Sequence, residues 1–123
     1  AIAVATHETD PCIVIYDEPY YDQMMLDVEE RARAHAGPNG RPSDAILRQG
    51  IGISEMAGFD ANGRFILPGL HKSMAKIDRH ALFFGLGKFI EVWDPRTLMA
   101  WPDAPPALKA ACQYHCDRMK VAL

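Results

Sequence analysis

Short apolar runs near the two ends of the chain predict β-strands. Residues 1–6 alternate loosely, and residues 12–16 form a β-branched run that ends in an aromatic side chain, which favours extended structure. Residues 81–85 and 88–93 have the same character. Because only Leu86-Gly87 separates these two runs, we expect them to form a β-hairpin.

Helical spacing of apolar residues predicts the remaining elements. From Tyr20 to Ala32 they recur at one-and-four spacing after a proline that suits a first helical turn. A loop rich in Gly and Pro follows over 37–42. Further helices are expected over 44–49 with Ser43 as the cap and Gly50 and Gly52 as breakers, over 68–75, from Pro95, and along the stripe of Leu108, Ala111, Cys112, His115 and Met119.

The stretch "FDANGRFILP" combines a turn signal with two charges. Asn62-Gly63 lies between the apolar runs 53–59 and 65–67, and this arrangement predicts a second β-hairpin. A tight turn needs only Asn-Gly, yet Asp60 and Arg64 frame it. The two flanking charges therefore suggest that the turn contacts a partner.

Composition narrows the classes of function. The net charge of −3 removes the general argument for nucleic acid, so any DNA contact must come from a local surface. Three cysteines, an odd number, argue against a disulfide scaffold and for a reducing cytoplasm. No signal peptide is recognisable, and no apolar run approaches the roughly 18 residues of a membrane helix. We therefore expect a cytoplasmic protein with no membrane partner.

Catalytic and metal-binding motifs are lacking. There is no nucleophile motif or phosphate loop with supporting context, so we expect no enzymatic activity and no cofactor. Cys112, His115 and Cys116 lie close together on the predicted last helix. A structural zinc site needs four ligands, so these three are better explained as helix residues, and no metal is expected.

An internal similarity suggests two copies of one unit. "CIVIYDEPYYDQMM" and "FIEVWDPRTLMAW" share a strand, a terminal aromatic residue, an Asp, a nearby Pro and a helix, and Trp93 lies 77 residues after Tyr16. We assign residues 1–42 to the remainder of a first copy and 43–123 to a second. The first copy's counterpart of the charged turn would precede Ala1, so we expect the chain to be an N-terminally incomplete version of a longer protein.

The second half resembles a known family. "DANGRFILPGLHKSMA" followed by "HALFFGLGKFIEVWDPRTL" is similar to the second half of the MraZ family, regulators of the division and cell-wall gene cluster. That family carries two AbrB-like units, each with an Asp-x-x-Gly-Arg turn, which is Asp60 to Arg64 here. The chain departs from the family pattern at His71, usually Leu, and at Lys72, usually Arg. Its first turn is missing, and its tail beyond Trp101 is unusually long.

The resemblance implies both a fold and an assembly. The fold is α+β, a double-split β-barrel of two AbrB-like repeats with short flanking helices, the first repeat incomplete at its N-terminus. The assembly is a ring-shaped homo-oligomer that binds short direct repeats in promoter DNA. Such a regulator would be cytoplasmic and nucleoid-associated.

Five residues are the candidate DNA contacts. Arg64 could contact guanine O6 and N7 or hold a phosphate, and Asp60 could orient its guanidinium. Asn62 and Gly63 tolerate the positive φ of a tight turn, and Lys72 could reach a neighbouring phosphate. Three alternatives remain: an exposed turn with a weak surface ion pair, an AbrB-like antitoxin that binds its operator and a toxin, and an oligomeric scaffold without DNA binding.

Overall fold

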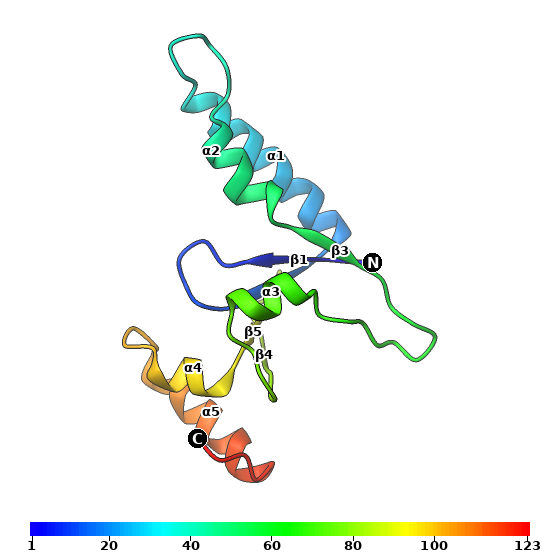
Figure 1. Ribbon diagram of the computed structural model, residues 1–123, viewed down its shortest axis with the longest axis vertical. Coiled ribbons are helices and arrows are strands. Elements are labelled where there is room, and N and C mark those ends of the chain that lie inside the picture. The colour runs from blue at the N-terminus through cyan, green and yellow to red at the C-terminus, as the bar shows by residue number, and fades with distance from the viewer.

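A five-stranded antiparallel sheet lies at the centre of the computed structural model, which describes all 123 residues (Figure 1). The strands are β1 (Ile2–Thr6), β2 (Ile13–Asp17), β3 (Glu55–Ala57), β4 (Leu82–Gly85) and β5 (Ile90–Trp93), in the order β3-β1-β2-β5-β4. The α+β class is confirmed. The sheet has two open edges, β3 and β4, and is not closed into a barrel within this chain.

The helices lie on two sides of this sheet. They are α1 (Glu18–Ala34), α2 (Asp44–Leu47), α3 (Gly69–Met74), α4 (Pro95–Ala100) and α5 (Pro106–Arg118). Figure 1 shows α1 and α2 side by side as an arm that projects from one end, with α4 and α5 at the other. The predicted Ser43 cap is confirmed, because its hydroxyl accepts a hydrogen bond from the Ile46 N–H at 3.4 Å.

One helix ending was predicted wrongly. Gly50 and Gly52 do not break the chain after α2, because residues Arg48–Gly52 continue as a π-helical segment, η1. Gly50 instead permits a close approach to α1. A Cβ atom at this position would lie 2.6 Å from Cγ1 of Val28, a buried residue of α1.

The predicted Asn-Gly hairpin is also wrong as a pair of strands. Only Glu55–Ala57 becomes a strand, and it pairs with β1, with Ile2 opposite Ala57. Residues 65–67 form no strand, and Phe65 and Leu67 pack against the core instead. A distant strand edge thus replaces the local partner. By contrast, the β4–β5 hairpin is confirmed, with the Leu86 N–H donating to the Phe89 carbonyl at 2.8 Å.

Apolar side chains form two clusters, one for each face of the sheet. The first contains Val4, Ile13, Ile15, Ala75, Ile77 and Val92, and the second contains Cys12, Trp93, Leu98, Cys112 and Cys116. Val92 and Trp93 are adjacent in β5 and point to opposite faces. The second cluster therefore anchors α4 and α5, whereas the first is covered by the segment that leads into and out of α3.

The 77-residue offset reappears in the pairing of β2 with β5. Ile13 lies opposite Val92, Val14 opposite Glu91 and Ile15 opposite Ile90. A shift of 77 residues carries Ile13 to Ile90 and Ile15 to Val92, so the offset maps the pairing onto itself. The two similar segments are consequently related by a local two-fold axis between Val14 and Glu91.

Candidate nucleic-acid interface

Asp60 organises the turn in the "DANGR" stretch. Its N–H donates to the Arg64 carbonyl at 2.7 Å, and its own carbonyl accepts from the Gly63 N–H at 3.1 Å. Its carboxylate accepts from the N–H groups of Asn62 and Arg64, both at 2.9 Å. Gly63 has φ +75°, a conformation that glycine adopts without strain. Four of the five candidate residues are thus brought together by backbone hydrogen bonds.

The Arg64 side chain is oriented but not consumed by the turn. Its Nε donates to Asp60 Oδ2 at 3.0 Å, and 75% of the side chain is exposed. The two terminal nitrogens have no partner in the chain. An arginine held at Nε presents these nitrogens as a planar fork, which matches bidentate recognition of a phosphate or a base edge.

The same contacts keep Asp60 ionised. The hydrogen bond from the Arg64 backbone N–H is the largest cause that lowers the pKa of the Asp60 carboxyl, and the Asn62 N–H and the Arg64 guanidinium lower it further. Hydrogen bonds to the charged form favour that form. The carboxylate therefore stays negative and keeps the guanidinium aligned across the ordinary pH range.

The turn lies at the end of a projecting loop. Figure 1 shows the segment between β3 and α3 reaching away from the body of the molecule. At the base of this loop Phe59 and Phe65 pack edge to face, with ring centroids 5.9 Å apart. Phe59 is 53% exposed and Ile66 is 88% exposed. An aromatic pair thus narrows the base of the loop and leaves the charged tip accessible.

Curated relatives share this sequence over most of the chain. A protein from Herpetosiphon aurantiacus is 31% identical over 111 residues, which is 85% of this chain and 73% of the relative. One from Phocaeicola vulgatus is 32% identical over 82 residues, or 67% of this chain and 51% of the relative. Both are named "Transcriptional regulator MraZ". This chain belongs to the MraZ family.

Coverage of the relatives is partial. A Marinobacter nauticus protein with the same name is 25% identical over 107 residues, which is 86% of this chain and 67% of the relative. Across these three MraZ proteins the chain spans between about half and three quarters of the relative's length. No model of a protein family matches the chain.

Lys72, the fifth candidate, stays a prediction in this MraZ chain. It is exposed on α3, and no hydrogen bond or ion pair joins it to the turn. Its neighbour His71 points the other way and is fully buried, and its Nε2 lies 2.7 Å from the Ile53 carbonyl oxygen. His71 therefore joins α3 to the segment after η1, which confirms the packing role that sequence alone left beside a surface role.

The cysteines of α5 are packing residues. Cys112 and Cys116 are buried with Trp93 and Leu98 in the second cluster, whereas His115 is exposed. Burial, and then the neighbouring Cys116, raise the pKa of the Cys112 thiol to about 11. Metal binding needs a thiolate, so burial explains this group better than ligation does. None of the helices is long and apolar enough to cross a membrane.

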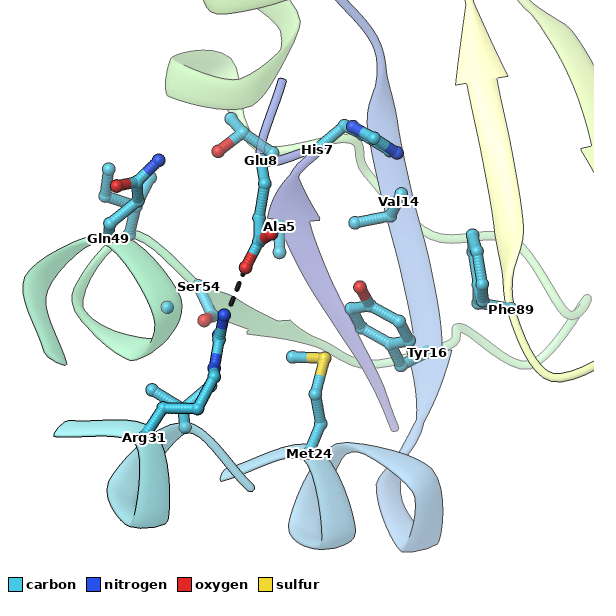
Figure 2. Close-up of a pocket in the computed structure, with 14 residues that line it drawn as sticks. Ala5, His7, Glu8, Val14, Tyr16, Met24, Arg31, Gln49, Ser54 and Phe89 are labelled. Carbon is cyan, nitrogen blue, oxygen red and sulfur yellow. Dashed lines mark hydrogen bonds and ion pairs between the residues drawn. The ribbon is translucent and has the colours of Figure 1, made fainter. Parts of the chain in front are cut away.

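Sequence reasoning missed a cavity of about 200 Å³ between the sheet and the helical arm (Figure 2). We call it the junction cavity. Its wall combines β1 and β2 with α1 and η1, and Phe89 closes one side. At its mouth Arg31 Nη2 lies 3.1 Å from Glu8 Oε1. No motif signals this site, because its residues come from segments far apart in the sequence.

Proposed function

We propose that this chain is a DNA-binding transcriptional regulator that contacts DNA through the Asp60–Arg64 turn. The observation that carries the proposal is the Arg64 guanidinium, which is fixed at Nε by Asp60 while both terminal nitrogens stay free. The printed name of the relatives supports the regulatory part.

The chemistry of the turn suits the major groove. A guanidinium fork can donate to guanine O6 and N7 at once, a contact worth about 1–3 kcal/mol of discrimination against a wrong base. Asn62 and Gly63 add little bulk at the tip, so the backbone can approach the DNA closely. In this proposal Lys72 binds an adjacent phosphate, which positions the protein without reading sequence.

Assembly reconciles the proposal with the net charge of −3. One turn offers a single cationic fork, too little for tight binding. In a ring-shaped homo-oligomer several turns meet successive direct repeats, and linked contacts raise the affinity by about 10²–10⁴ in favourable geometry. We propose such a ring at short direct repeats in the promoter of the division and cell-wall gene cluster.

The finer fold, a double-split β-barrel of two AbrB-like repeats, is part of the same proposal. Its support is an uncovered half of the sheet. Phe65, Leu67 and α3 cover the β1–β2 side of the first cluster. On the other side β4 has a free edge, and Phe83 and Ile90 are 54% and 39% exposed. A first-repeat counterpart of the turn segment and α3 would cover these residues in the same way.

Fluorescence anisotropy tests the proposal. A labelled duplex with short direct repeats and a scrambled duplex are each titrated with the chain across a salt series. Arg64→Ala is compared with Arg41→Ala, which removes the same charge from an exposed loop position. We expect preferential binding to the repeats that weakens steeply with salt. Arg64→Ala should weaken it by about 5- to 150-fold for each guanine that the arginine recognises.

Three outcomes would contradict the proposal. Equal binding of both duplexes would remove sequence specificity. Equal affinity of Arg64→Ala and Arg41→Ala would move the contact away from the turn. An intact oligomer that binds neither duplex would favour the scaffold alternative, and light scattering of the same samples reports the oligomeric state. An antitoxin of the AbrB type with one unit is disfavoured by the two-fold register of β2 and β5.

A further inference from the structure

The junction cavity has polar groups that the protein leaves unpaired. In Figure 2 the Tyr16 hydroxyl and the Glu8 carboxylate face the same space, and the one dashed line joins Glu8 to Arg31. The Tyr16 hydroxyl and the Gln49 side-chain amide make no hydrogen bond within the chain. Glu8 Oε2 and the other guanidinium nitrogens of Arg31 are also free. A few polar groups that converge on a cavity are typical of a small-molecule site.

Apolar side chains form the remaining wall. Val14 and Val28 face the cavity from the sheet and from α1, and the Met24 thioether lies below the Tyr16 hydroxyl in Figure 2. The Tyr16 ring packs against Phe89, with centroids 5.7 Å apart. Thioether sulfur makes favourable contacts with aromatic rings. This half of the cavity therefore suits an aromatic ring.

The polar half restricts the charge of a ligand. Glu8 and Arg31 already balance each other, so a ligand needs no net charge. Entering a cavity with apolar walls costs a charged or zwitterionic molecule much more hydration than an uncharged one. To bind Glu8 and Arg31 together, a ligand must place a donor beside an acceptor. A carboxamide or a lactam has both on one edge, with N–H for Glu8 and C=O for Arg31.

The volume restricts the size. About 200 Å³ is smaller than the roughly 300–1,000 Å³ of pockets that hold drug-sized ligands. One ring with its amide edge is the scale that fits. Tyr16 can serve as a donor to such a ligand, because burial, more than its neighbours, raises the pKa of its hydroxyl to about 12 and keeps it protonated.

We propose that the junction cavity binds a small uncharged aromatic molecule with an amide edge, held between the Glu8–Arg31 pair and the Tyr16 hydroxyl. The site is separate from the Asp60–Arg64 turn and does not depend on DNA binding. It touches the sheet, α1 and η1 together, so an occupant would bridge the helical arm and the sheet. A π-helical segment in the wall agrees with the frequent occurrence of such segments at functional sites.

Calorimetric and NMR titrations of the whole chain without DNA test the proposal. Nicotinamide and uracil are the probes. Nicotinate, which replaces the amide NH₂ by a charged oxygen, and zwitterionic alanine are the controls. We expect saturable binding of nicotinamide or uracil, with shifts at Met24 and Tyr16, and at least tenfold weaker binding of nicotinate, which Glu8 repels.

Three variants link that binding to the cavity. Tyr16→Phe keeps the ring and removes the hydroxyl, so binding should weaken by roughly two- to tenfold. Tyr21→Phe makes the same change outside the cavity and should leave binding unchanged. Met24→Trp fills the cavity without altering its polar groups and should abolish binding, with circular dichroism confirming that each variant is folded.

Several results would overturn the proposal. Absence of saturable binding by both amides would remove the site, and so would equal effects of Tyr16→Phe and Tyr21→Phe. Equal or tighter binding of nicotinate or alanine would show that the ligand class is wrong. Retained amide binding in folded Met24→Trp would place the ligand elsewhere on the molecule.

Discussion

Gly50 is the position where the structure makes the sharpest energetic prediction. An added Cβ would lie 2.6 Å from Val28 Cγ1 and 2.9 Å from Cγ2. Val28 is only 3% exposed, and a β-branched side chain in a helix has one strongly preferred χ1 rotamer. The valine therefore cannot rotate away at low cost. Gly50→Ala should push η1 away from α1.

Gly52 supplies a matched control within the same segment. There the nearest atoms to an added Cβ are at 3.9 and 4.0 Å, which is ordinary contact. Both substitutions gain the same helix propensity, about 1 kcal/mol, so this gain cancels when the two are compared. The difference then reports the clash, and overpacking typically costs about 1–3 kcal/mol.

Urea denaturation followed by circular dichroism measures this difference. We expect the free energy of unfolding of Gly50→Ala to be about 1–3 kcal/mol below that of Gly52→Ala. Val28→Ala should partly restore Gly50→Ala, because it removes the two methyl groups that clash, so the double variant should be less destabilised than the sum of the singles. Equal stability of Gly50→Ala and Gly52→Ala would refute the close approach of η1 and α1.

Two further predictions concern carboxylates. Because the folded turn lowers the pKa of Asp60, its contribution to order in the turn is full above the unfolded pKa of about 3.9 and is lost as the pH falls through the lower folded value; NMR shifts of the Asn62 and Arg64 amides should report this, and Asp60→Asn should abolish the titration. Asp94 accepts from the N–H groups of Arg96 and Asp78, whereas Asp17 only caps α1. Asp94→Ala should therefore destabilise the fold by about 1–3 kcal/mol more than Asp17→Ala in thermal melts, and equal losses would contradict the second anchor.

Local sequence signals predict structure correctly where the partner is also local. The β4–β5 hairpin pairs strands that adjoin in sequence, and the turn residues Asp60 and Arg64 are four positions apart, so sequence could place both. The partner of β3 is β1, more than 50 residues away, and no local pattern reveals it. Gly50 has the composition of a helix breaker, and only the position of Val28 shows why the residue is small. The junction cavity was inaccessible to sequence for the same reason.

The position of the charged turn depends on both copies of the repeated unit. The turn belongs to the second copy, but the strand that enters its loop, β3, pairs with β1 of the first copy. After the turn, α3 lies against β1 as well, and His71 joins it to Ile53. Both ends of the loop are thus fixed on the opposite copy. The orientation of Arg64 is consequently set by the joint between the two copies, so a substitution in β1 that loosens the pairing of Ala3 with Met56 should disturb the turn although it leaves every residue of the turn unchanged.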